Sequence, residues 1–76
     1  MTDLETAILD VLRHAQPDAM TLTDVHAELV RRGWAVHEIP PLYITRALIA
    51  LTNAGWIRNE QSWRALEAPN PPLATT

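Results

Sequence analysis

The sequence predicts a mainly α-helical domain that ends in a small β-hairpin. Three segments repeat apolar residues at helical spacing, and each is bracketed by residues that begin and end helices. Two short segments rich in Trp and Ile follow around a polar centre, which is typical of a hairpin. With 76 residues and no cysteine, the chain has room for one domain, which must be stabilised by packing rather than by disulfide bonds.

The first helix is expected to begin after Thr2. Glu5 lies three residues later, at the spacing of a capping box, in which each side chain accepts a hydrogen bond from the other residue's backbone N–H. Pro17 should end the helix near His14 or Ala15, because a proline inside it would remove a hydrogen bond and clash with the preceding turn. One apolar stripe links these ends and consists of Leu4, Ile8, Val11, Leu12 and Ala15.

The second helix is expected to begin at a similar cap. Thr21 has Asp24 three residues later, and Thr23 is the competing cap. Gly33 supplies a left-handed residue that ends the helix, just after two arginines that favour the negative end of its dipole. The apolar face consists of Leu22, Val25 and Leu29, with Val30 beside it.

The third helix is expected from about Pro41 to Ala54, after a connector over residues 34–39. Pro40 and Pro41 pre-set the backbone for a helix start, and Gly55 ends the helix. Its inward stripe consists of Ile44, Ala47, Leu48 and Leu51.

Residues 56–59 and 62–66 form the predicted hairpin, and Met20-Thr21 is expected to add a short third strand to it. We expect Trp56 and Trp63 to pack across the hairpin and against the helices. Residues 67–76 are rich in proline and almost uncharged, so a disordered or extended tail is expected after a domain over residues 1–66.

Three helices around one core, with a hairpin over its edge, form the order of the winged helix-turn-helix. Residues 43–57 resemble the recognition helix of winged-helix repressors, which often closes with leucines and an Ala-Gly-apolar-apolar exit into the wing. They are also similar to a segment of the ferric uptake regulator family that contains a Thr-Val-Tyr-Arg stretch. Tyr43 and Thr45 of this chain depart from that pattern. The matching positions are Ile44, Arg46, Leu48 and Leu51. The resemblance covers residues 20–66.

The charge distribution divides the chain into two halves. The net charge of −3 argues against indiscriminate nucleic-acid binding. Residues 1–30 hold six carboxylates and one arginine, a net of −5, whereas residues 31–66 hold five arginines and two carboxylates, a net of +3. This asymmetry favours an anionic partner for the second half.

The resemblance implies that the third helix enters the major groove of double-stranded DNA and that the wing contacts phosphates. Arg46 is the candidate for a base contact, because one guanidinium can bond two acceptors of guanine. The other candidate DNA-binding residues lie on the third helix, at the end of the second and on the hairpin: Tyr43, Thr45, Arg31, Arg32, Arg58 and Arg64. For these surface arginines the alternative is pairing with nearby carboxylates.

A second interpretation rests on the outward side of the third helix. A helical wheel places Leu42, Arg46, Ile49 and Asn53 opposite the core stripe. Two of these four are large and apolar, which suits a protein partner or a homodimer seam, unless the hairpin or the connector covers them. Trp34, beside Gly33, is a further candidate interface anchor.

Neither a metal site nor catalysis is indicated. His14, His26 and His37 lie on different elements without ligand spacing, and no nucleophile, phosphate loop or paired carboxylates are recognisable. We expect no cofactor and no enzymatic activity. The acidic start of the chain and the lack of a long apolar run lead us to expect a soluble, cytoplasmic protein without membrane contact.

The sequence therefore predicts a small prokaryotic or phage-borne transcriptional regulator that binds DNA, with a homodimer expected. The alternative is a winged-helix protein-interaction module, such as an adaptor, a complex subunit or a phage inhibitor of a host protein, which does not contact DNA.

Overall fold

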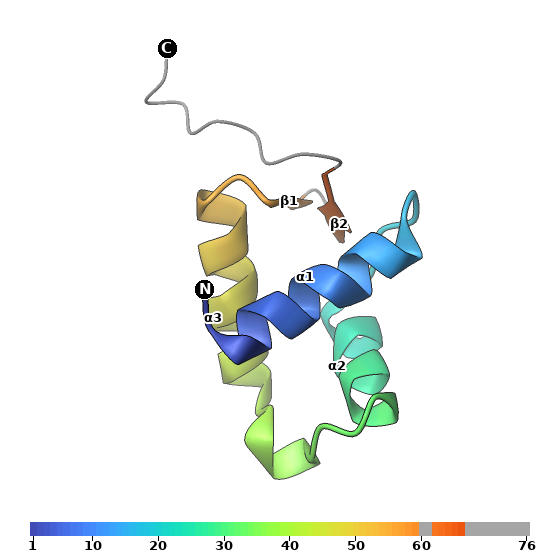
Figure 1. Cartoon of the computed structure of the whole chain (residues 1–76), viewed down its shortest axis with the longest axis vertical. Helices are drawn as coiled ribbons and strands as arrows, with labels where there is room; N and C mark the ends of the chain where they lie inside the picture. Colours follow the sequence, from blue (N-terminus) through green and yellow to red (C-terminus); the bar gives the residue numbers. More distant parts are fainter. Residues whose placement is uncertain (60–61, 67–76) are drawn as a thin grey trace.

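A computed structural model describes residues 1–59 and 62–66. The elements occur in the order α1 (Asp3–Ala15), α2 (Leu22–Arg31), the single 3-10 turn η1 (Val36–Glu38), α3 (Pro41–Asn53), β1 (Ile57–Asn59) and β2 (Trp63–Ala65). The prediction of a mainly helical domain with a small hairpin is confirmed. α1 crosses in front of α3 and reaches over α2, and the hairpin lies at the end where α3 finishes (Figure 1). The predicted tail, from residue 67 onward, lies outside the described residues.

The predicted capping boxes fix the starts of α1 and α2. The Thr2 hydroxyl accepts from the Glu5 N–H at 3.1 Å, and the Glu5 carboxylate accepts from the Thr2 N–H at 2.8 Å. Thr21 and Asp24 make the equivalent pair at 3.2 and 3.3 Å, so Thr21 rather than Thr23 is the cap. Each box satisfies two backbone donors that the helix itself leaves without partners.

Two glycines end α2 and α3 as predicted. Gly33 has φ of 106° and Gly55 has φ of 84°, a left-handed backbone that L side chains rarely adopt. The residue after each glycine donates its N–H back into the last turn: Trp34 to the Leu29 carbonyl at 3.1 Å, and Trp56 to the Leu51 carbonyl at 3.0 Å. The chain therefore reverses directly after each helix, which brings Trp34 and Trp56 against the core.

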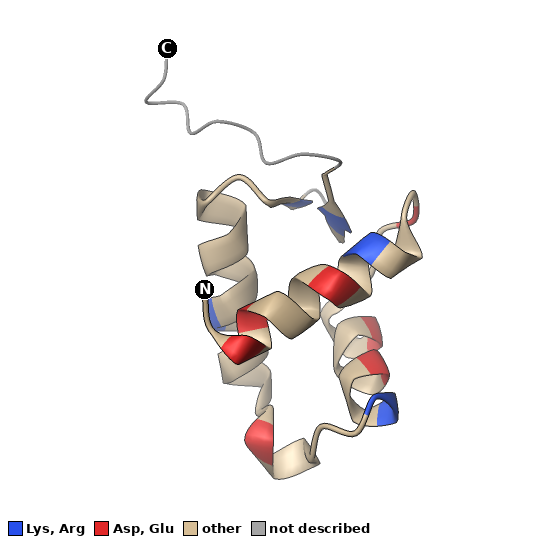
Figure 2. Ribbon diagram, in the orientation of Figure 1, with Lys and Arg blue, Asp and Glu red and all other residues tan. Residues whose placement is uncertain are grey.

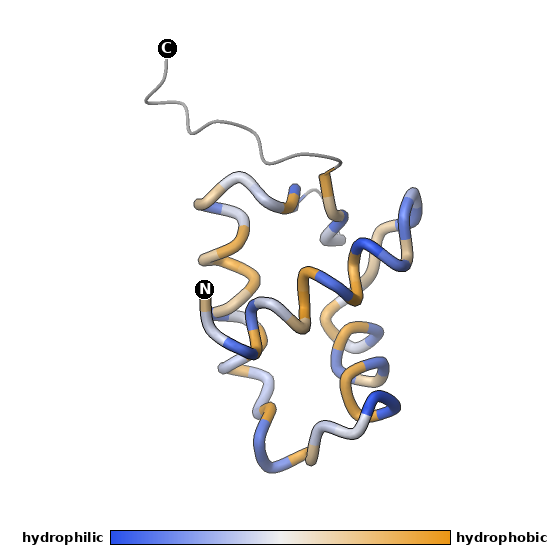
Figure 3. Tube along the Cα trace, in the orientation of Figure 1, coloured by the Kyte–Doolittle hydropathy of each residue, from blue (hydrophilic) through white to orange (hydrophobic). Residues whose placement is uncertain are grey.

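The core lies where the three helices meet, and Figure 3 shows hydrophobic residues on all three of them. The predicted stripes of α1, α2 and α3 supply most of it, while Leu4, Ala15 and Leu22 are only half-buried. Leu9 and Ile39 are core residues that the helical patterns did not predict. The residues of the core are at most 6% exposed: Ile8, Leu9, Val11, Leu12, Val25, Leu29, Ile39, Ile44, Ala47, Leu48, Leu51, Ile57 and Ala65.

The connector before α3 contains structure that the sequence did not predict. η1 closes with the Glu38 carboxylate accepting from the Ala35 N–H at 2.9 Å. Ile39 follows and is fully buried, directly ahead of Pro40 and Pro41. The connector is therefore anchored in the core at the residue that leads into α3.

The hairpin is antiparallel, with Ile57 opposite Ala65, and both side chains are buried. The predicted third strand is present as a single bridge, in which Met20 and Trp63 exchange two backbone hydrogen bonds of 2.8 and 2.9 Å. The Gln16 side chain adds a bond from Nε2 to the Ala65 carbonyl at 3.0 Å. The hairpin is thus tied to the link between α1 and α2.

Candidate interaction surface

The outer face of α3 is open to solvent. We use this name for Leu42, Arg46, Ile49 and Asn53, the four residues that the helical wheel places opposite the core, and all four are exposed. Leu42 is 56% exposed and Ile49 is 53% exposed. Neither the hairpin nor the connector, as far as the structure describes them, covers these two side chains.

The opposite side of the same helix explains this orientation. Ile44, Ala47, Leu48 and Leu51 are buried in the core that α3 shares with α1, α2 and β1, and these positions recur every three or four residues. Burying this stripe fixes the rotation of α3 about its axis. The residues half a turn away must then point outward.

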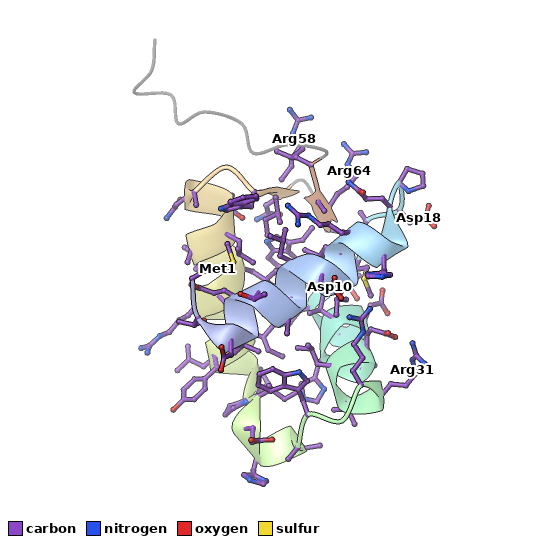
Figure 4. All side chains as sticks on the ribbon, in the orientation of Figure 1. Met1, Asp10, Asp18, Arg31, Arg58 and Arg64 are labelled. Atoms are coloured by element: carbon purple, nitrogen blue, oxygen red, sulfur yellow. The ribbon has the colours of Figure 1, made fainter. Side chains whose placement is uncertain are left out.

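Further apolar side chains extend the outer face toward the start of the chain. Tyr43 is 52% exposed on α3, and Met1 is 65% exposed. Met1 lines a hollow with Ala50 and Trp56, which places it beside the C-terminal half of α3 (Figure 4). Of the six large hydrophobic residues exposed in the described ranges, four therefore belong to this side of the molecule.

Charged groups also gather beside the outer face. A shallow hollow is lined by Tyr43 and Arg46 of α3 and by Glu5 of α1, so the acidic first turn of α1 lies next to α3 (Figure 2). Asp3 belongs to the same turn and is exposed. Within residues 1–59 and 62–66, Arg46 forms no ion pair. The outer face therefore joins a single cation to apolar side chains, with carboxylates along one edge.

The arginines at the end of α2 have carboxylate partners, which was the alternative to phosphate binding. Arg31 makes two bonds to Glu28, at 2.9 and 2.6 Å. Arg32 donates to Asp10 of α1 at 2.6 Å and to Glu28 at 3.1 Å. The two guanidinium groups lower the pKa of Glu28 to about 2, and the carboxylates raise the pKa of both arginines.

These pairs link α1 to α2 across the surface, since Arg32 contacts a carboxylate on each helix. Any phosphate bound at this end would have to displace or share the existing carboxylates. In this structure both guanidinium groups are therefore already engaged by carboxylates.

The hairpin arginines lie apart from α3. Arg58 is directly opposite Arg64 in the antiparallel register, and both side chains point away from the buried pair formed by Ile57 and Ala65 (Figure 4). Arg46 lies on α3. Figure 2 shows that the basic positions of α3, of α2 and of the hairpin are separate from one another. The candidate DNA-binding arginines thus occupy three separate places within the described chain.

Two other predicted site residues are half-buried. Trp34 packs against the core and keeps part of its surface exposed, as the interpretation of it as an interface anchor requires. Thr45 is half-buried on the flank of α3. Trp56 and Trp63 also pack against the core, as predicted.

Sequence reasoning missed the contribution of Met1 and of the acidic edge. A residue at the start of one helix carries no local signal that it will lie beside another helix.

The described ranges contain no group of three side chains that could hold a metal ion. No helix in these ranges is long and apolar enough to span a membrane.

Comparison with known proteins found no family model, no curated protein and no solved structure that matches this chain.

Proposed function

We propose that this chain is a winged-helix protein-interaction module that binds a protein partner through the outer face of α3. The element order, with Met20 bridged to Trp63 as a short third strand of the hairpin, supports the winged-helix assignment. The observation that carries the function is the exposure of Leu42, Tyr43 and Ile49, each above one half, around a single arginine. Large side chains grouped in this way are typical of a protein-binding surface.

The charges beside α3 favour a protein over DNA. If α3 entered the major groove, the first turn of α1, with Asp3 and Glu5, would face the phosphates, and like charges at an interface are unfavourable. Arg31 and Arg32 would have to leave Glu28 and Asp10 or share their donors with them. A protein partner can use the same carboxylates and Arg46 together.

The test is photo-crosslinking in cells with a photoreactive amino acid at position 49 or, as the control, at position 36. Val36 is 61% exposed but lies on η1, outside the four residues of the outer face. We expect one protein adduct of defined mass from position 49, none from position 36, and loss of the adduct when Leu42→Ser is added. Absence of an adduct at position 49 would contradict the proposed function.

DNA binding is the second candidate, and the outer side of the hairpin favours it. Arg58 and Arg64 face each other there, as a wing that contacts phosphates would require. In this case an electrophoretic shift with duplex DNA should weaken steeply with salt. Arg46→Ala should cost about 1–3 kcal/mol for the specific site only. The lack of any shift at low salt would remove this candidate.

A further inference from the structure

We infer that the partner on the outer face of α3 is a second copy of this chain, bound through an antiparallel pair of α3 helices about a two-fold axis. The inference rests on the proposed function and names its partner. It is carried by the spacing of the outer face, by its self-complementary charge and by the position of α1 beside it.

The four residues of the outer face are spaced as the seam of a helix pair. Leu42, Arg46, Ile49 and Asn53 follow one another at intervals of four, three and four residues, the repeat that keeps one stripe of a helix against another helix. α3 has 13 residues, so this stripe runs along almost all of its length of about 20 Å. A surface with this pattern fits another helix better than it fits a flat or irregular surface.

An antiparallel arrangement suits these residues better than a parallel one. In a parallel two-fold pair each position meets itself, so Arg46 would face Arg46 of the second copy across an apolar seam. In an antiparallel pair centred between positions 46 and 49, Arg46 meets Ile49 of the second copy. The aliphatic stem of the arginine can then cover Ile49 while its guanidinium reaches the edge of the seam.

The edge that Arg46 reaches is the acidic one. Arg46 and Glu5 line the same hollow, so the first turn of α1 borders the Arg46 side of α3. A two-fold axis perpendicular to two antiparallel helices keeps this side in place, so Arg46 of each copy approaches the first turn of α1 in the other. Asp3 is exposed in that turn and, like Arg46, has no ion pair within the described residues. A closed two-fold pair uses both groups twice.

The first experiment measures the molar mass of the full chain by light scattering and sedimentation over a range of concentrations. We expect a dimer for the wild type, a monomer for Leu42→Ser with Ile49→Ser, and a dimer for the control Val36→Ser, which removes an exposed apolar side chain of η1. Circular dichroism checks that all three chains stay folded. A dimer that survives the double substitution would overturn the inference.

The second experiment tests the charge pair by mixing. Arg46→Glu and Asp3→Arg should each weaken self-association about tenfold or more. An equimolar mixture of the two variants should form a mixed dimer, because both contacts between positions 46 and 3 then join opposite charges. Asp18→Arg, which reverses an exposed charge in the link after α1, is the control and should not rescue Arg46→Glu. Failure of the mixture to associate would overturn the antiparallel geometry.

A further outcome separates this inference from the proposed function. If the wild type is monomeric at every concentration while position 49 still forms an adduct with a different protein in cells, the second copy is wrong and the interaction surface stands. If the chain is monomeric and no adduct forms, both are wrong.

Discussion

Both sides of α3 carry large apolar side chains, but their surroundings are very different. On the inner side, Ile44, Leu48 and Leu51 are at most 2% exposed and belong to the core that α3 shares with α1, α2 and β1. On the outer side, Leu42 and Ile49 are more than half exposed, with Arg46 between them. One side stabilises the fold, whereas the other contributes little to it within a single chain.

This difference shows that apolar residues in a helix need separate explanations. The inner residues are accounted for by the free energy gained when their surface leaves water. The outer residues gain less of this free energy in one chain because more than half of each apolar side chain stays in water, and exposed Leu and Ile carry a risk of nonspecific association. The proposed partner would account for their presence, because a complex would bury them.

The largest effect is expected from truncating the inner side. Leu48→Ala should lower the free energy of unfolding by about 2–5 kcal/mol, because Leu48 is fully buried and its removal leaves a cavity. Urea denaturation followed by tryptophan fluorescence measures this change. A loss below about 1 kcal/mol, the size typical of an average substitution, would mean that the inner side packs loosely.

A smaller effect is expected at the residue that leads into α3. Ile39→Val removes one methylene group from a fully buried side chain and should cost about 0.5–1.5 kcal/mol. Val36→Ala is the matched control, since Val36 lies in the same connector but is 61% exposed. Equal stabilities of the two variants, measured by urea denaturation, would place Ile39 outside the core.

The outer side should hardly affect the stability of a single chain. Ile49→Ala should change the free energy of unfolding by no more than about 0.5 kcal/mol when the chain is dilute enough to be monomeric. At higher concentration the wild type should unfold at a higher temperature than this variant, because association stabilises the folded state. Thermal unfolding at two protein concentrations measures both effects.

The smallest effect is expected at the ion pairs of α2, far from the outer face. Arg31 and Arg32 hold the pKa of Glu28 at about 2, against an ordinary value of 4.5. The unfolded chain therefore takes up the proton first, so the stabilisation is fully present above pH 4.5 and is lost as the pH falls toward 2. Wild type and Glu28→Gln should differ in Tm at neutral pH and converge in acid. A constant difference across that range would contradict the assignment.

Local signals in the sequence were sufficient to predict the helix ends. A capping box needs only Thr21 and Asp24, and a left-handed end needs only Gly33, so neither depends on the rest of the fold. Ile39 was missed because its burial comes from the way the short connector before α3 enters the core. No periodic pattern marks such a position.

At the candidate interaction surface too, local features were predictable from the sequence and features that depend on helix packing were not. The wheel of α3 predicted which residues point outward, because rotation about one helix axis is a local property. Glu28 lies three and four residues before Arg31 and Arg32, a spacing that favours ion pairs and was readable in the sequence. The bond from Arg32 to Asp10 joins residues 22 positions apart and depends on how α1 packs on α2.

The three tryptophans offer a spectroscopic use of this fold. Trp34 follows α2, Trp56 follows α3 and Trp63 begins β2, so each indole reports on a different junction. The Arg13 guanidinium lies 5.4 Å from the centre of the Trp56 ring, and a cation at this position changes the emission of an indole. In a chain with Trp56 as its sole fluorophore, emission would follow the docking of α1 onto the end of α3 during refolding.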